Sequence, residues 1–352
     1  MQVLLFIATC SAMTLSSCQQ ALNSYKRLSC YDITLPNVII PQCWPILVNT
    51  VFKRSNIWNI TLMDKLNRVL LVAGTHGNEL TGIYLQKLIK DRLYNADRAT
   101  FSVLSMTGNP EAVKKNVRFI DDDLNRQFAV KNSDDSEANA EQTLAQKITS
   151  MHSDNNKQLI VDLHNTTSNM GATLILLSND PFYEKMGAYV KQRMPESNIL
   201  FEDRKPWQDQ PYLCTTGQHG IMIEVGAQAH GSLTYNSLEL MKHMLTLVLD
   251  YVEKHNLDQV GEVENYDAYY YLEEVQIPLD HDGMRAATVH PTICGRDFEV
   301  VKQGDPILAT FFGYDVLWES EKEVYPHFIN ESAYSAANIA MALAEKKKVI
   351  VA

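Results

Sequence analysis

Short apolar runs alternate with longer amphipathic stretches between residues 65 and 258. The runs are almost continuously hydrophobic, which is typical of strands buried on both faces of a parallel sheet. The stretches between them repeat apolar residues at helical spacing, which marks one buried face. The predicted strands are Val69–Ala73, Phe101–Met106, Gln158–His164, Thr173–Leu177 and Gly220–Val225, and the predicted helices are Glu79–Tyr94, Ala140–Met151, Glu184–Met194 and Ser237–His255.

The pattern changes after about residue 258. Tyr266–Ile277 is rich in aromatic and β-favouring residues, and short apolar segments separated by turns follow it. Strands alternating with helices, then strands alone, predict an α/β fold: a mostly parallel mixed sheet flanked by helices, with a smaller β-rich C-terminal domain. We assign residues 65–258 to the α/β domain and 259–352 to the β-rich domain. The further strands predicted there are Thr288–His290, Glu299–Val301, Ile307–Phe312 and Tyr325–Phe328.

Residues 1–64 differ from the rest and are predicted to be an N-terminal extension, partly disordered. Pro36, Pro41 and Pro45 would interrupt any long helix there. The apolar residues 3–8, followed by small residues, resemble the core of a signal peptide, but no Lys or Arg precedes them. We predict a cytoplasmic protein, with secretion as the alternative if residues 1–17 act as a signal peptide.

Composition and charge exclude some classes of partner. Hydrophobic residues make up 45% of the chain and charged residues 21%, as in ordinary globular proteins. The net charge of −11 argues against binding to nucleic acid, and no apolar run reaches the length of a membrane span. Four of the six cysteines fall within the first 43 residues, so the remaining Cys214 and Cys294 suit a reducing compartment.

Two predicted strand ends carry side chains that can bind a metal. The strand that begins at Val69 ends in a glycine-bracketed turn that holds His76 and Glu79. These two residues are three apart, so one helical turn would let both meet a single metal ion. A catalytic zinc needs about three protein ligands, and His164 at another strand end fits the third. Asp162 lies on the same strand face as His164 and could orient its imidazole.

A carboxylate also ends the apolar strand Gly220–Val225. Zinc-dependent hydrolysis needs a general base, and Glu224 could supply it if a partly desolvated site raises its affinity for protons. The alternative is a structural glutamate paired with an arginine.

Residues 118–126 contain two arginines around three consecutive aspartates. An isolated cluster of this kind is usually a solvated set of ion pairs. A functional interpretation also fits the residues. Asn125 and Arg126 could together hold a carboxylate, and Arg118 could stabilise an oxyanion on an attacked carbonyl.

Six short blocks follow one another between about residues 66 and 340. They are Gly74–Gly82, Asn109-Pro110, Asp121–Arg126, Asp162–Thr167, Glu224–Gly226 and Tyr325–Glu331. Together they resemble the aspartoacylase and aminoacylase-3 family, which is related to the zinc carboxypeptidases. The resemblance implies a zinc-carboxypeptidase-like α/β domain whose active site is capped by the β-rich domain.

The resemblance also implies roles for individual residues. One zinc ion per subunit would be held by His76, Glu79 and His164. Glu224 would be the general base and proton shuttle, and Arg118 would polarise the scissile acyl carbonyl. The residues implied in substrate binding are Asn125, Arg126, Asn165, Phe328 and Tyr334, and those implied in support of the metal ligands are Asp123 and Asp162.

Two departures from the family concern the substrate. Aspartoacylase has an arginine ten residues before the catalytic glutamate, where it binds the side-chain carboxylate, whereas this chain has Cys214. The segment after Tyr334 also lacks the Glu-Lys pair that the family tends to have. Arg204 or Lys205 could substitute from the same loop. An uncompensated carboxylate in a closed pocket costs several kcal/mol, so neutral or aromatic N-acyl amino acids become candidates beside N-acetyl-aspartate.

We therefore expect a zinc-dependent amidohydrolase that removes an acyl group from small N-acyl-L-amino acids. One alternative is a carboxypeptidase-like metallopeptidase, which would need an open cleft for a peptide. Another is a non-catalytic relative that binds zinc or a ligand. The family resemblance also implies a homo-oligomer, either a dimer or a tetramer.

Overall fold

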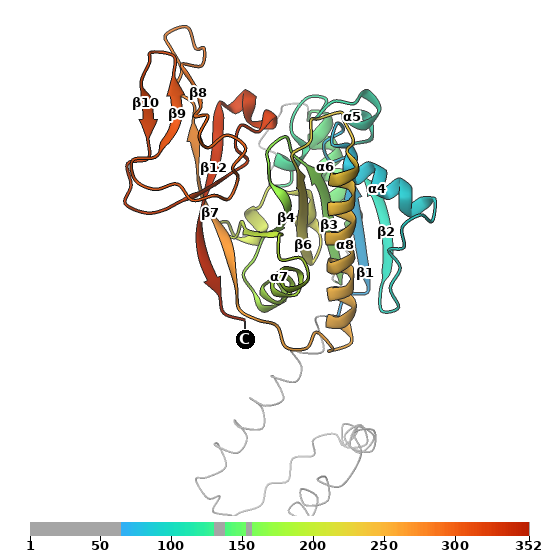
Figure 1. Ribbon diagram of the computed structural model, residues 1–352. Helices are drawn as coiled ribbons and strands as arrows, with labels where there is room; N and C mark the ends of the chain where they lie inside the picture. The colour runs from blue at the N-terminus through green and yellow to red at the C-terminus, as the bar shows by residue number, and fades with distance from the viewer. Residues whose placement is uncertain (1–64, 130–137, 153–156, 352) are drawn as a thin grey trace, which may run out of the picture. The chain divides into compact units, whose positions relative to one another are not determined.

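The computed structural model describes residues 65–129, 138–152 and 157–351, and its framework is a nine-stranded sheet (Figure 1). In spatial order its strands are β11 (Tyr325–His327), β12 (Ile339–Val349), β7 (Tyr266–Gln276), β5 (Asn198–Phe201), β4 (Gly171–Leu176), β6 (His219–Gly226), β3 (Gln158–Asn165), β1 (Arg68–Ala73) and β2 (Ser102–Thr107). One parallel group is β2, β1, β3 and β6, and another is β4, β5 and β7. The β4–β6, β7–β12 and β11–β12 pairs are antiparallel. The predicted mostly parallel mixed sheet is confirmed.

Helices and short 3-10 segments cover both faces of this sheet, so its inner strands are buried on both sides. One face packs against α4 (Leu80–Lys90), α7 (Pro181–Arg193) and α8 (Tyr235–Asn256) (Figure 1). The other face packs against α6 (Ala140–His152) and the short 3-10 segments η2 (Leu124–Arg126) and η4 (Leu213–Thr216). Along β1, Leu71 points to the first core and Leu70 to the second, as the two-residue period of a strand requires. No helix in the described ranges is long and apolar enough to cross a membrane.

The β-rich region predicted after residue 258 is also confirmed. A small antiparallel sheet contains β8 (Ala287–Val289), β9 (Pro306–Thr310) and β10 (Asp315–Leu317), and a third hydrophobic core lies beside it. The long strands β7 and β12 pair along most of their length and extend the large sheet towards this region (Figure 1). The boundary between 258 and 259 stays a prediction, and the predicted extension 1–64 lies outside the described residues.

Several predicted elements differ from the observed ones. The predicted strand Glu299–Val301 is wrong, because only an isolated bridge between Val301 and Val324 forms there. The helix predicted from Glu79 begins at Leu80, with Glu79 at its N-cap position. The elements that the sequence pattern did not predict are α5 (Pro110–Lys115), β5, β10 and β12.

Close packing of α4 on the sheet depends on a glycine within the helix. A Cβ atom on Gly82 would lie 2.7 Å from Cβ of Leu163 in β3 and 3.1 Å from Cβ of Ala73 in β1. Such distances are too short for an unstrained contact, so any side chain would push the helix away from both strands. Because Glu79 directly precedes α4 and His164 directly follows Leu163, this contact also sets the spacing between two of the predicted metal ligands.

We predict that Gly82→Ala destabilises the protein by about 1–3 kcal/mol through overpacking. Alanine favours helices over glycine by about 1 kcal/mol, so local propensity alone predicts the opposite sign. Thermal unfolding followed by circular dichroism measures the difference. Lys90→Ala, on the exposed end of the same helix, is the matched control and should leave the melting temperature nearly unchanged. An unchanged or raised melting temperature for Gly82→Ala would contradict the packing argument.

Candidate functional site

The predicted site residues gather where neighbouring parallel strands end. His76 and Glu79 follow β1, His164 lies near the end of β3, and Glu224 lies near the end of β6. The strand register places His164 directly opposite Glu224. The predicted side chains therefore lie together at the carboxyl ends of neighbouring strands, which is where open α/β sheets commonly bind ligands.

The turn after β1 is held in place by the loop that carries Arg118. The backbone N–H of Gly77 donates to the carbonyl oxygen of Arg118 at 3.1 Å. A Cβ atom on Gly77 would lie 2.0 Å from the backbone of Ala112, so only glycine allows this approach. The turn then places His76 and Glu79 on the same side, which is the arrangement that their spacing predicts.

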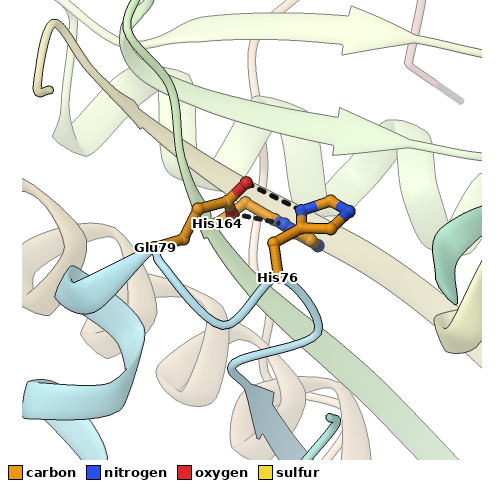
Figure 2. Close-up of side chains that lie close together, drawn as sticks. All are labelled: His76, Glu79 and His164. Carbon is orange, nitrogen blue, oxygen red and sulfur yellow. Dashed lines mark hydrogen bonds and ion pairs between the residues drawn. The ribbon is translucent and has the colours of Figure 1, made fainter. Parts of the chain in front are cut away.

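Glu79 lies between the imidazoles of His76 and His164 (Figure 2). Its Oε1 is 2.7 Å from Nδ1 of His76, and its Oε2 is 2.8 Å from Nδ1 of His164. All three side chains are buried, and one donor atom from each lies within 4.8 Å of the others. The three predicted ligands therefore form one compact group that could hold a metal ion.

The outer nitrogen of each imidazole faces a second carboxylate. Nε2 of His76 is 3.0 Å from Asp123, and Nε2 of His164 is 2.9 Å from Asp162. A carboxylate at this position accepts a hydrogen bond from the Nε2–H group of a neutral imidazole. The Nδ1 lone pair then stays free, which is the tautomer that a metal ligand needs. Asp162 is itself fixed by the Thr75 hydroxyl, which donates to it at 2.7 Å. The donor set thus fits a metal ion.

Glu224 faces the same pocket with an unused oxygen atom. Its side chain is buried, and its Oε1 has no hydrogen-bond partner within the described residues. Burial raises the pKa of Glu224 well above its usual value, and the negative charge of Glu79 raises it further. By contrast, His76 and His164 outweigh the effect of burial on Glu79 and hold its pKa well below the usual range. The two carboxyl groups are therefore driven towards opposite protonation states.

Arg118 is fixed beside the metal-ligand group by two carboxylates. Its Nη1 donates to Glu79 at 3.0 Å and its Nη2 donates to Asp123 at 2.8 Å. The backbone of its loop is held by Glu141 of α6, which accepts from the N–H groups of residues 120, 121 and 122. The guanidinium is consequently a rigid positive charge at the wall of the pocket.

Asn125 and Arg126 differ in how many of their polar groups are hydrogen-bonded within the protein. The Asn125 amide donates to Asp162 at 3.3 Å and accepts from the backbone N–H of Leu213 at 2.9 Å, so both ends are engaged. Arg126 donates to the carbonyl oxygen of Asn125 at 3.0 Å. Within the described ranges no carboxylate lies at ion-pair distance from its guanidinium. The positive charge of Arg126 is thus available to a ligand, whereas both ends of the Asn125 amide are already hydrogen-bonded within the protein.

Asn165, Phe328 and Tyr334 lie at the same pocket, and the first of them is held on both sides. The Asn165 backbone N–H donates to Glu79 at 3.2 Å, and its side-chain oxygen accepts from the N–H of Thr81 at 3.1 Å. The rings of Phe328 and Tyr334 lie 5.8 Å apart. Tyr334 comes from η5 (Ser332–Ala337), so residues late in the chain complete the wall.

One pocket contains every predicted catalytic, substrate-binding and metal-binding residue. It encloses about 560 Å³, including its open mouth. The predicted residues that line it are His76, Glu79, Arg118, Asn125, Arg126, His164, Asn165, Glu224, Phe328 and Tyr334. Asp123 and Asp162 lie behind the histidines instead of in the lining. The lining residues that sequence reasoning missed are Thr166, Ile175, Glu202, Tyr212, Met222, Glu331 and Ala333.

Among the missed residues, Glu331 joins two walls of the pocket. Its carboxylate accepts from the N–H and the hydroxyl of Thr167, at 2.9 and 3.0 Å, in the segment that follows His164. It also accepts from the N–H of Ala333 at the start of η5. The block Asn330-Glu331 was recognised in the sequence, but nothing in its pattern indicated which segment this carboxylate would bind.

The position of Cys214 does not match the substrate-binding place expected from the family. Cys214 is fully buried in the second hydrophobic core and does not line the pocket. The pocket lining also excludes Arg204 and Lys205, which were considered as substitutes. The neighbouring Tyr212 does line it, so the polypeptide around Cys214 reaches the pocket through a different side chain.

Comparisons with known proteins agree with this geometry. Residues 65–252 match the succinylglutamate desuccinylase/aspartoacylase catalytic domain, and residues 264–346 match the AstE/AspA barrel-sandwich hybrid domain. The crystal structure of murine aminoacylase 3 superimposes with a TM-score of 0.75 at 31% identity, covering 82% of this chain and 98% of that one.

Relatives in sequence carry two kinds of name. Aspartoacylase of Danio rerio is 35% identical over 80% of this chain and 92% of its own length. The N-acyl-aromatic-L-amino acid amidohydrolase (carboxylate-forming) of Xenopus laevis is 34% identical over 81% of this chain and 96% of its own length. A probable aspartoacylase of Nostoc sp. (strain PCC 7120) is 34% identical over 82% of this chain and 99% of its own length. The resemblance seen in the six sequence blocks is confirmed, and the chain belongs to the succinylglutamate desuccinylase/aspartoacylase family.

Proposed function

We propose that this protein is a zinc-dependent amidohydrolase that splits N-acyl-L-amino acids into a carboxylate and the free amino acid. One observation carries the proposal: the His76, Glu79 and His164 donor atoms converge in the same pocket as the unpartnered carboxylate oxygen of Glu224. The names of the relatives, aspartoacylase and N-acyl-aromatic-L-amino acid amidohydrolase, support the same reaction class.

Glu224 has the properties of a general base that later acts as an acid. Zinc held by the three ligands would supply Lewis-acid chemistry, which lowers the pKa of water and polarises a carbonyl. Glu224 takes a proton from the water whose oxygen attacks the acyl carbon. When the carbon–nitrogen bond breaks, Glu224 returns that proton to the leaving amine. Burial and the charge of Glu79 raise its pKa, which strengthens its affinity for the proton that it takes from water and later returns.

The two arginines of the pocket have different tasks in this proposal. Arg118 is fixed beside Glu79 and is placed to stabilise the negative charge that develops on the attacked carbonyl oxygen. Arg126 holds the carboxylate of the amino acid, because its guanidinium is exposed to the pocket without an acidic partner among the described residues. Tyr334, Phe328 and Asn165 enclose the rest of the substrate.

The residues that line the pocket favour a neutral or aromatic amino acid, instead of aspartate, as the amino acid that hydrolysis releases. Its described lining contains two arginines and no lysine, and Arg118 is already paired with two carboxylates. Once Arg126 holds the main carboxylate, a second carboxylate on the substrate has no cation to meet. Ile175, Met222 and Phe328 offer apolar contacts instead.

A carboxypeptidase-like activity is less well supported. A peptide would need an open cleft, whereas the β11–β12 region brings Phe328 and Tyr334 over a pocket of about 560 Å³. A purely ligand-binding role leaves one observation unexplained: the Oε1 atom of the buried Glu224 has no hydrogen-bond partner among the described residues.

We also propose that the protein resides in a reducing, cytoplasmic compartment. Cys214 and Cys294 form no disulfide within the described residues, as is common in that compartment. Asn165, the acceptor of an N-glycosylation sequence, is buried against Glu79 and Thr81, so a glycan there would be incompatible with the fold.

We predict that His164→Ala reduces bound zinc from about one equivalent per chain to a small fraction, because one of three ligands is lost. Asp123→Ala should weaken zinc binding by roughly 10- to 100-fold, because it removes the acceptor that orients His76. Metal analysis of the purified, dialysed protein measures both effects. His243→Ala, at an exposed histidine of α8 that does not line the pocket, is the control. Full zinc content in His164→Ala would refute the ligand assignment.

We predict that Glu224→Gln lowers kcat by roughly 10²- to 10⁴-fold while zinc stays bound, because the amide cannot carry the proton. Steady-state kinetics with N-acetyl-L-tyrosine, combined with metal analysis, test this. Glu273→Gln, which changes an exposed glutamate, provides the matched control. Near-normal turnover by Glu224→Gln would show that another group is the base.

We predict that kcat/KM for N-acetyl-L-tyrosine exceeds that for N-acetyl-L-aspartate by roughly 100-fold or more. The physical reason is that an unpaired carboxylate in a closed pocket costs several kcal/mol. Parallel assays of amine release from the two substrates measure the ratio. A ratio below one would mean that a cation outside the described lining recognises the acidic side chain.

A further inference from the structure

Three segments that are distant in sequence meet on one side of the pocket. Arg126 lies at the end of η2, Tyr212 lies just before η4, and Glu202 directly follows β5. All three line the pocket, but sequence reasoning singled out only Arg126. Glu202 and Tyr212 have no part in the reaction described above, although both are close to the group that holds the substrate carboxylate.

The Arg126 guanidinium rests against an aromatic ring, and no carboxylate of the described residues lies at ion-pair distance from it. Its central carbon lies 5.6 Å from the centre of the Tyr212 ring, within the usual range of a cation–π contact. Such a contact restricts the direction of the guanidinium but leaves most of its N–H donors free. A direct ion pair with Glu202 would instead compete with an incoming carboxylate.

Tyr212 is itself fixed at its hydroxyl and on both sides of its backbone. The hydroxyl donates to Oε2 of Glu202 at 2.8 Å. The preceding carbonyl oxygen, of Pro211, accepts from the N–H of Phe128 at 3.3 Å, and the following N–H, of Leu213, donates to Asn125 at 2.9 Å. The backbone contacts tie the segment to the loop of Arg126, and the hydroxyl contact sets the ring.

Glu202 is anchored to the large sheet. Its N–H donates to the carbonyl oxygen of Leu176 at 2.8 Å, which continues the β4–β5 pairing, and its own carbonyl oxygen accepts from the Gln210 amide at 3.0 Å. The series Glu202, Tyr212, Arg126 therefore begins at a rigid strand end and finishes at the only lining arginine without an acidic partner among the described residues.

We infer that Glu202 is a positioning residue for substrate binding: it fixes the Tyr212 hydroxyl, and the Tyr212 ring orients Arg126 towards the substrate carboxylate. This inference rests on the proposed function, since it assigns the carboxylate of an N-acyl amino acid to Arg126. In this inference Glu202 acts through the Tyr212 hydroxyl instead of on the reacting atoms. Its removal should therefore weaken binding of the substrate and leave the chemical step intact.

The experiment compares Glu202→Ala, Glu202→Gln, Tyr212→Phe and the double variant Glu202→Ala/Tyr212→Phe in the zinc-loaded protein. With N-acetyl-L-phenylalanine we expect KM to rise about tenfold in Glu202→Ala and in Tyr212→Phe, with kcat within about threefold of the unchanged protein. Glu202→Gln should keep KM within about threefold, because the amide oxygen still accepts from the tyrosine hydroxyl. Asp203→Asn, next to Glu202 but outside this pocket, is the control.

The double variant separates a shared role from two independent ones. If Glu202 acts only through Tyr212, the double variant raises KM no further than either single change. A KM increase of about a hundredfold in the double variant would overturn the inference. So would a large fall in kcat with unchanged KM in Glu202→Gln, since Glu202 would then act in proton transfer. Tyr212→Phe removes a single oxygen atom and keeps the test valid if Glu202→Ala does not fold.

Failure of the proposed function is distinguishable from failure of this inference. If the unchanged protein hydrolyses no N-acyl amino acid, the proposed function is wrong whatever the variants do. Calorimetric titration then measures the affinity for N-acetyl-L-phenylalanine in the absence of turnover. It tests whether Tyr212 and Glu202 orient Arg126, because Arg126 can bind a carboxylate that is not hydrolysed. Weaker binding by about tenfold in Tyr212→Phe supports the inference, and unchanged binding overturns it.

Discussion

The buried carboxylate of Glu79 is the interaction on which the site depends. Each of its oxygens meets two groups: Oε1 faces His76 and Arg118, and Oε2 faces His164 and the N–H of Asn165. A buried charge is tolerated only when it is paired and hydrogen-bonded, so removing one partner leaves an expensive unpaired group. The turn after β1, the end of β3 and the loop of Arg118 are therefore held in mutual register by a single side chain.

The position of the candidate metal-ligand group was predictable because each of its members lies at or just past the end of a strand. His76, Glu79 and His164 lie at the ends of strongly apolar strands, and the ends of parallel strands meet at one edge of a sheet. The same reasoning found Glu224 on the adjacent strand. Sequence pattern was enough here, because burial on both faces makes such strands easy to recognise.

The substrate side of the pocket was not predictable in the same way. β12 is built largely from Ala, Met, Leu, Glu and Lys, which favour helices, and only its pairing with β7 makes it a strand. β5 is too short to show a clear pattern, so Glu202 at its end went unnoticed. The Asn125 amide is hydrogen-bonded to Asp162 and Leu213, and Cys214 is buried in the second hydrophobic core. Both features depend on contacts between distant segments, which spacing along the chain does not reveal.

The pairing of β12 with β7 has a consequence for how the protein is made. The candidate metal ligands and Glu224 have all been synthesised once the chain reaches residue 224. Phe328, Glu331 and Tyr334 come about a hundred residues later, beside or between β11 and β12. Contacts between such distant segments form late, because the chain between them must first be ordered. A nascent chain on the ribosome can thus assemble the metal-ligand edge of the sheet before residues 325–349 exist to cover it. Until the last strands add to the sheet, the candidate metal-ligand group would lack the walls that Phe328, Glu331 and Tyr334 supply.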